Sequence, residues 1–274
     1  MIDLLRLVRT YNLVLAAAGV VAGGWIALEA LQTPNVLVLA AVSAVGFGMA
    51  GYVLNDIWDR AADRVNRPGG ERPLALGRVS RGTADLCVAG GALVGLGAAA
   101  VVNGTAVLWG FAALAVLALY SPLLKRRGLP GNVAVAVVGG LPLMYGAIAV
   151  GRAAAGIVPW TLAAWIHLVR EIVKDIDDQA GDRVLRRRTL PLVLGPQRAS
   201  VVAAALAAVF VPLSLALPAG AHYHGAYFLI ALFAQLVVLA VASRLFTGRT
   251  QGTSRLLKGA MLVGIVALVA GRVA

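Results

Sequence analysis

The stretch that decides the fold runs from Val36 to Asp63 and reads VLVLAAVSAVGFGMAGYVL followed by NDIWDRAAD. The first part is uncharged and, as a helix, is long enough to cross a hydrocarbon core about 30 Å thick. The second part adds an amide and three carboxylates. At about 3.6 residues per turn, Asn55, Asp59 and Asp63 follow one another along one side of a helix. Asp56 lies beside them, so the four side chains fill an arc of roughly 100°. The stretch predicts a membrane-spanning helix that ends in an acidic face.

A second acidic face follows another apolar run later in the chain, where residues 170–182 read REIVKDIDDQAGD. Asp175, Asp178 and Asp182 stand at helical positions i, i+3 and i+7, within about 60° of one another, whereas Asp177 points to the opposite side. These two segments, with the loop after the first, hold nine of the twelve acidic residues of the chain. In a chain that is 60% hydrophobic, this concentration of acid is the main indication of a functional centre.

The two acidic faces together predict a magnesium site. Like charges on one helical face repel by a few tenths of a kcal/mol per pair unless a cation lies between them. Mg²⁺ supplies such a charge, and it prefers carboxylate, amide and phosphate oxygens as ligands. The candidate metal ligands are Asn55, Asp56, Asp59, Asp63, Asp175, Asp178 and Asp182.

Apolar stretches long enough to cross a membrane recur along the whole chain. We count nine, at approximately 12–32, 35–54, 85–102, 105–122, 132–150, 157–174, 199–217, 225–246 and 256–273. The expected fold class is therefore all-α. We expect a polytopic membrane protein with nine transmembrane helices in one domain over residues 1–274, capped on the cytoplasmic side by loops 55–84 and 175–198.

The strongly basic balance of the chain, a net charge of +12, is explained by membrane topology. Of the 24 basic residues, 22 lie on one side of the predicted spans, and only Arg152 and Arg272 lie on the other. Because basic residues accumulate on the cytoplasmic side of membrane proteins, the N-terminus is expected in the cytoplasm and the C-terminus outside. Nucleic acid is therefore not an expected partner, and the sequence indicates no obligate protein partner.

Both acidic faces are expected at the cytoplasmic ends of their helices, because charged groups at mid-bilayer would cost roughly 2.5 to 3.5 kcal/mol each. If the two helices converge, the faces form the polar mouth of an apolar chamber. Mg²⁺ held there would neutralise a diphosphate and make it a better leaving group. Basic side chains near the rim, including Arg67, Arg72, Lys125 and Lys174, would stabilise the departing oxygens. An allylic carbon so activated would ionise, and a second substrate would capture it.

The motifs resemble those of the UbiA superfamily of intramembrane prenyltransferases. Asn55-Asp56-x-x-Asp59-x-x-x-Asp63 is similar to the first motif of that family, and Asp178-x-x-x-Asp182 to the second. The resemblance extends over nearly the whole chain and includes Arg9 and Asn12 before the first span, Tyr120 to Lys125 after the fourth, and Gly131-Asn132 at the fifth. It implies a helical bundle around a central cavity, in the cell membrane, with the active site facing the cytoplasm. Asn55, Asp59, Asp63, Asp178 and Asp182 would then bind Mg²⁺ and diphosphate, and Tyr120 and Lys125 would lie near the prenyl diphosphate.

Within that superfamily, residues 170–178 and 188–191 are most similar to the digeranylgeranylglyceryl phosphate synthases, which make the second ether bond of archaeal-type lipids. The expected donor is geranylgeranyl diphosphate, and the expected acceptor is the lipid geranylgeranylglyceryl phosphate. Three departures concern the acceptor: a longer loop at 66–73, Ala75 in place of a common proline, and Arg186 in place of a usual glycine. The basic cluster after the second motif, which includes Arg187 and Arg188, is a candidate site for the acceptor phosphate.

Two alternatives remain open from the sequence. The first is prenylation of an aromatic acceptor, such as 4-hydroxybenzoate or a precursor of a quinone or chlorophyll. The second, from another class, is a transporter of divalent cations or phosphate, since carboxylates within membrane spans also mark ion pathways. A pathway needs polar residues toward the far side, where the sequence offers only Glu29, Arg152 and the loop histidines 222 and 224.

The distribution of basic residues gives a topological prediction. A reporter fused after Ala274 should be external, and one inserted after Arg127 should be cytoplasmic, because an even number of spans precedes the second point and an odd number the first. Reporter activity or labelling on each side of the membrane measures this. Both reporters on the same side would contradict the nine-span count.

Overall fold

The computed structural model describes residues 2–67, 69 and 72–273, and within them every regular element is a helix. In these residues nine helical segments are long and apolar enough to cross a membrane, which confirms the predicted number. They are α2 (Thr10–Leu28), α3 (Asn35–Trp58), α5 (Arg81–Val102), α6 (Gly104–Leu119) with the turns η1 (Tyr120–Leu124) and η2 (Lys125–Arg127), α7 (Leu129–Ala149), η3 (Ala153–Gly156) with α8 (Ile157–Asp177), α11 (Pro196–Gly220), α12 (Gly225–Phe246) and α13 (Thr253–Val273). The remaining helices are short: α1 (Ile2–Leu7), α4 (Arg60–Asn66), α9 (Gln179–Val184) and α10 (Leu190–Leu194).

The observed helix ends differ from the predicted span ends at two places. The first span was expected to continue to residue 32, but α2 ends at Leu28 because Glu29 adopts a left-handed conformation (φ 58°) whose N–H bonds Trp25. The second span was expected to end at residue 54, yet α3 continues to Trp58 and α4 follows directly. Asn55 and Asp56, the first two residues of the first motif, therefore belong to the membrane-spanning helix.

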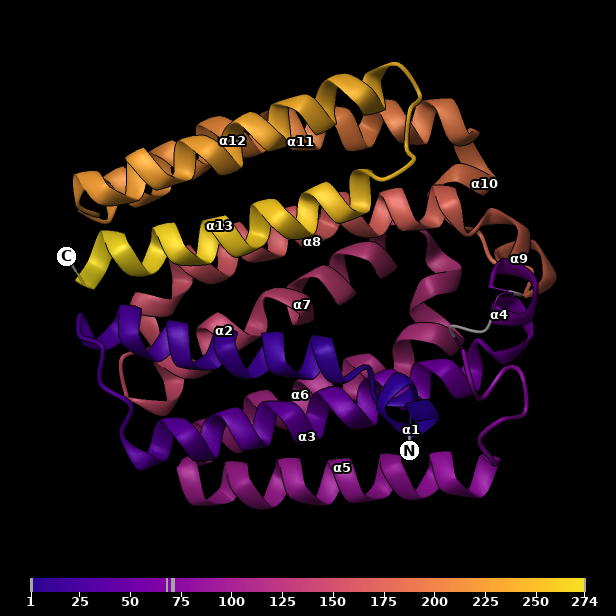
Figure 1. Cartoon of the computed structure of the whole chain (residues 1–274), viewed down its shortest axis with the longest axis horizontal. Helices are drawn as coiled ribbons and strands as arrows, with labels where there is room; N and C mark the ends of the chain where they lie inside the picture. The colour runs from indigo at the N-terminus through magenta and orange to yellow at the C-terminus, as the bar shows by residue number, and fades with distance from the viewer. Residues whose placement is uncertain (1, 68, 70–71, 274) are drawn as a thin grey trace.

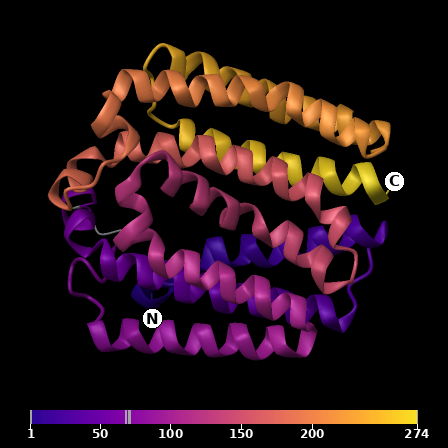
Figure 2. The same ribbon diagram turned by 180° about the vertical axis from the view of Figure 1, so that it is seen from behind.

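The long helices lie side by side, and the short ones gather at one end of the bundle (Figure 1). That end holds α1, α4, α9 and α10, and the N-terminus lies near it, whereas the C-terminus lies at the other end (Figure 1; Figure 2 from behind). The last long helix, α13, packs against α2 and α8, so the first and last spans are neighbours. The acidic motifs belong to the end that carries the short helices.

Close contact between α2 and α7 depends on two glycines. A Cβ atom added to Gly146 would lie 1.9 Å from the carbonyl oxygen of Val20, and one added to Gly23 would lie 1.9 Å from that of Leu143. Membrane helices associate through such small residues, because lipid supplies no hydrophobic driving force between helices. The two glycines therefore set the distance between two helices that line the centre of the bundle.

This contact predicts a selective loss of stability. Gly146→Ala should lower the stability of the purified protein by on the order of 1–3 kcal/mol, because α2 and α7 must move apart to accept the methyl group. Gly97→Ala is the matched control: it lies on exposed α5 with nothing within 4 Å of the added Cβ atom. Thermal unfolding in detergent should show a lower midpoint for Gly146→Ala only. Equal midpoints for the two variants would show that the contact does not limit stability.

Candidate active site

Each acidic motif spans a junction between two helices, and an aspartate occupies the junction residue. Asp59 joins α3 to α4 with φ −90° and ψ 4°, and Asp178 joins α8 to α9 with φ −96° and ψ 9°. Helical hydrogen bonding nevertheless continues through the first junction, from the Asp59 N–H to Asn55 (2.8 Å) and from the Asp63 N–H to Asp59 (2.8 Å). The helical spacing inferred from the sequence is thus retained while the direction of the chain changes.

The two motifs are held together by Asn66, for which the sequence predicted no role. Its side-chain amide donates to the carbonyl oxygen of Asp178 (3.1 Å), and its side-chain oxygen accepts from the N–H of Gly181 (2.8 Å). A Cβ atom on Gly181 would lie 2.4 Å from the Asn66 amide nitrogen and 2.7 Å from the Ala62 carbonyl oxygen. Only glycine allows α4 and α9 to approach this closely, so Asn66 and Gly181 form a clamp between the motifs.

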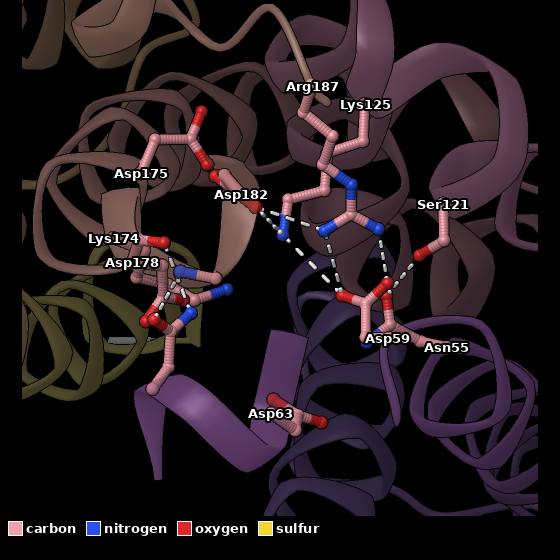
Figure 3. Close-up of polar contacts among 12 residues, drawn as sticks. Asn55, Asp59, Asp63, Ser121, Lys125, Lys174, Asp175, Asp178, Asp182 and Arg187 are labelled. Carbon is pink, nitrogen blue, oxygen red and sulfur yellow. Dashed lines mark hydrogen bonds and ion pairs between the residues drawn. The ribbon is translucent and has the colours of Figure 1, made fainter. Parts of the chain in front are cut away.

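Two cations, Arg187 and Lys125, lie between the first and second motifs (Figure 3). Arg187 bonds Asp59 and also donates to Asp182 at 3.0 Å. The Lys125 ammonium lies 3.5 Å from both carboxylates. Arg187 is 5% exposed and Asp182 is completely buried. Arg187 was expected to bind the acceptor phosphate at the rim, but it lies at the centre of the acidic site, against Asp59 and Asp182.

The charges of this group stabilise one another. Burial alone would raise the pKa of Asp59, but Lys125 and Arg187 outweigh burial, so that the pKa lies below its usual value. Burial likewise opposes the charge of Arg187, yet its contacts with Asp59 and Asp182 raise the pKa of the guanidinium above its usual value. Both effects follow from opposite charges a few ångströms apart in a site with little water. The contacts therefore favour the charged forms of Asp59 and Arg187.

Arg67 and Arg72 form ion pairs with the other aspartates of the two motifs. Arg67 contacts Asp63 (3.3 Å) and Asp178 (3.0 Å), one residue from each motif. Arg72 contacts Asp56 (3.2 Å) and lies 3.6 Å from Asp63. Burial and the neighbouring carboxylates raise the pKa of Asp63 above its usual value, although Arg72 opposes this. The two arginines predicted at the rim are thus already ion-paired to the acidic residues.

Asp56 occupies a different position from the one expected of a metal ligand. It is buried and accepts hydrogen bonds from Arg9 and Arg72. Among the described residues that line the cavity, neither Asp56 nor Asp182 appears. For Asp56 the reason is that its side of α3 faces the α1–α2 junction, where Arg9 has a left-handed backbone conformation (φ 54°). Asp56 holds Arg9 in place and does not face the substrate space.

The other predicted ligands are fixed by uncharged partners. Asn55 accepts a hydrogen bond from the Ser121 hydroxyl (2.8 Å), and Asp175 accepts one from the Asn132 amide (2.9 Å). Tyr120 is 7% exposed and opens the π-helical turn η1, which carries Ser121 as well. Ser121 was not singled out from the sequence, although it lies inside the segment that resembles the family.

A cavity of about 1160 Å³ connects these residues to the apolar interior. Its volume exceeds the roughly 300 to 1,000 Å³ of a typical small-molecule site. Apolar side chains line its walls, on one side from α3, α6 and α7 and on the other from α8 and α11 to α13. The predicted residues that line it are Arg9, Asn12, Asn55, Asp59, Asp63, Arg67, Arg72, Tyr120, Lys125, Lys174, Asp175 and Asp178. The arrangement suits a ligand with an anionic head and a hydrocarbon tail.

Comparison with known proteins identifies the family. A profile of the UbiA prenyltransferase family matches residues 15–265. The chain belongs to the UbiA prenyltransferase family. It is 37% identical to a digeranylgeranylglyceryl phosphate synthase of Methanopyrus kandleri over 97% of both chains.

Its fold is similar to that of a UbiA homologue from Aeropyrum pernix K1 (TM-score 0.81, 23% identity, 96% of this chain and 98% of that one). It is also similar to a UbiA homologue from Archaeoglobus fulgidus bound to DMAPP and Mg²⁺ (TM-score 0.63, 18% identity, 98% and 97%). The chain is thus an enzyme of prenyl transfer and a multi-pass membrane protein.

The oxygen atoms of this UbiA family member fit Mg²⁺ bound together with a phosphate group. Among the described residues, no three carboxylate, histidine or cysteine side chains meet closely enough to hold a metal by themselves. Mg²⁺ is usually held by one or two carboxylates plus the oxygens of a substrate phosphate, so such a cage is not required. Asp59, Asp63 and Asp178 present carboxylate oxygens to the cavity, so they are the residues that would hold the ion. Asp56 and Asp182 each have a buried carboxylate oxygen without a hydrogen-bond partner in the described part of the chain, but neither lines the cavity.

We expect metal binding to depend on diphosphate. Mn²⁺, a spectroscopic substitute for Mg²⁺, should bind the UbiA protein weakly alone and at least tenfold more tightly with inorganic diphosphate. Without diphosphate, Arg187 and Lys125 already neutralise Asp59 and Asp182. The free Mn²⁺ signal in electron paramagnetic resonance measures both affinities, and Asp59→Asn should remove the effect of diphosphate. Equally tight binding without diphosphate would contradict the prediction.

Proposed function

We propose that the protein transfers a geranylgeranyl group from geranylgeranyl diphosphate to geranylgeranylglyceryl phosphate. The observation that carries the proposal is the pairing of two acidic motifs around Arg187 and Lys125 at the mouth of one large apolar cavity. The 37% identity with a relative named digeranylgeranylglyceryl phosphate synthase supports this acceptor. The A. fulgidus homologue bound to DMAPP and Mg²⁺ supports a prenyl diphosphate donor and a Mg²⁺ cofactor.

The reaction uses residues of both motifs. When bound, Mg²⁺ neutralises the diphosphate and makes it a better leaving group. Lys125 lines the cavity 3.5 Å from Asp59 and Asp182 and is placed to stabilise negative charge on the departing oxygens, while Arg187 holds the two carboxylates in position. The allylic C–O bond of the donor breaks, and the diphosphate leaves with the electron pair. The hydroxyl oxygen of the acceptor forms the new C–O bond, and its proton passes to an oxygen of the departing diphosphate.

The walls of the cavity protect the reactive carbon. Side chains such as Phe47, Leu117 and Leu141 line it beyond the acidic mouth and offer no polar group. Because water would capture an allylic cation, an apolar chamber favours transfer to the acceptor over hydrolysis. The tails of donor and acceptor would occupy this chamber, and both heads would remain at the mouth.

The orientation of the chain in the membrane is part of the proposal. We place the N-terminus and the end with α4, α9 and α10 in the cytoplasm, and the C-terminus outside. The distribution of basic residues, 22 of 24 on one side, supports this orientation. Both substrates would then reach the active site from the cytoplasmic side.

Product analysis tests the proposal. Protein in neutral-lipid nanodiscs, given Mg²⁺ and geranylgeranyl diphosphate, should convert geranylgeranylglyceryl phosphate to its digeranylgeranyl product and leave 4-hydroxybenzoate unchanged, as mass spectrometry would show. Asp59→Asn and Asp178→Asn should each reduce turnover at least a hundredfold, because each removes a charge that holds Mg²⁺ and diphosphate. Asp85→Asn is the matched control, since Asp85 is exposed on α5 and pairs only with Arg81 among the described residues.

The aromatic acceptor is the alternative outcome of this experiment. A prenylated aromatic acid without any digeranylgeranyl product would replace the proposed acceptor while keeping the reaction type. Normal turnover in Asp59→Asn would exclude the acidic site as the place of reaction. The transporter alternative is set aside, because the family is one of prenyltransferases.

A further inference from the structure

A second group of cations lines the same cavity beside the second acidic motif. Arg170 and Lys174 come from α8, and Lys258 comes from α13, the helix that packs against α8 (Figure 1). All three line the cavity and are partly buried. Because α8 and α13 are in contact and all three side chains line one cavity, we treat them as one group. We call Arg170, Lys174 and Lys258 the α8–α13 basic cluster.

The α8–α13 basic cluster carries more positive charge than its protein partners neutralise. Glu171 is buried and accepts hydrogen bonds from Arg170 (3.1 Å) and Lys174 (2.9 Å). Lys258 forms no hydrogen bond or ion pair with any described residue, and its ammonium lies 5.8 Å from the centre of the Tyr11 ring. The Nε atom of Arg170 is buried without a hydrogen-bond partner. Three cations and one carboxylate leave a net charge of +2.

At the centre of the acidic site, by contrast, the charges balance. There Arg187 and Lys125 share Asp59 and Asp182, so two cations meet two carboxylates. Cations that only set membrane topology can stay in water, as exposed Arg249 does in the loop before α13. Partial burial of unneutralised charge costs free energy unless something pairs with it. The α8–α13 basic cluster therefore has the properties of a binding site for an anion.

We infer that the α8–α13 basic cluster binds the phosphate group of the acceptor lipid, separately from the donor diphosphate. This inference rests on the proposed function. A phosphate monoester carries a charge of about −1.5 to −2 at neutral pH, which matches the net charge of the cluster. The site also continues into an apolar wall: Ile166 lies one turn before Arg170 on α8, and Met261 and Ile265 follow Lys258 on α13, all facing the cavity. The phosphate binds at the cluster, and the acceptor tail lies along this wall.

Two anionic heads can then be held near each other without sharing cations. The donor diphosphate is held at the acidic motifs, and the acceptor phosphate is held by α8 and α13. This division favours a phosphorylated acceptor over a neutral one, so the cluster determines acceptor specificity. Lys258 is the residue to test, because its removal leaves no described carboxylate unpaired.

The experiment compares Lys258→Gln with the wild type and with Arg249→Gln, a matched loss of one exposed positive charge nearby. In neutral-lipid nanodiscs, Lys258→Gln should raise the KM for geranylgeranylglyceryl phosphate about tenfold, the effect expected for loss of one charge-assisted contact. The KM for geranylgeranyl diphosphate should stay within about twofold of the wild-type value, a free-energy change of only about 0.4 kcal/mol. Lys258→Arg should restore most of the loss, and Arg249→Gln should change neither constant.

Two further measurements separate specificity from general damage. With geranylgeranylglycerol, which lacks the phosphate, Lys258→Gln and wild type should have equal kcat/KM. Calorimetric titration of geranylgeranylglyceryl phosphate without donor should show the same roughly tenfold loss of affinity in Lys258→Gln. If wild-type protein converts neither acceptor, the proposed function is wrong and the inference falls with it. If wild-type protein is active but Lys258→Gln changes both KM values equally, or neither, only the inference is overturned.

Discussion

The ion pairs among Asp59, Arg187 and Asp182 are the interaction on which the rest of the active site depends. Removing two carboxylates and a guanidinium from water is costly, and it is compensated only when the charges lie against one another. Here Asp59 comes from the bend after α3, Asp182 from α9, and Arg187 from the segment that follows α9. Segments more than 120 residues apart in the chain are therefore joined at one point.

The ion pairs among Asp59, Arg187 and Asp182 must rearrange when substrate binds. A diphosphate with its metal brings both negative and positive charge to carboxylates that already have a cation. Arg187 can exchange a carboxylate partner for a phosphate oxygen at little electrostatic cost, because its planar guanidinium suits both groups equally well. The site thus stays close to neutral with and without substrate. This balance allows a strongly charged ligand to enter the edge of a membrane protein.

The sequence predicted the fold well because membrane spans leave a local signal. Long apolar runs, and the accumulation of arginine on one side of the membrane, can be recognised without knowledge of tertiary contacts. The number of spans is confirmed in the described residues. The helical spacing of Asn55, Asp59 and Asp63 was also local. The roles of Arg187, Asp56 and Asn66 could not be predicted in this way. A buried arginine such as Arg187 and an exposed one such as Arg186 look alike in a basic loop. The partner of Arg187 in the first motif and the partners of Asn66 lie more than 110 residues away, and those of Asp56 lie 16 and 47 residues away, so no helical periodicity indicates any of them.

The clamp between Asn66 and Gly181 has a consequence for recombination between relatives. It joins the two halves of the chain through one side chain and one backbone N–H, in a space too small for any Cβ atom at position 181. Segments exchanged between homologues would keep the mouth intact only if both partners of this contact were inherited together. Directed shuffling should place its crossovers outside the interval that separates the two residues.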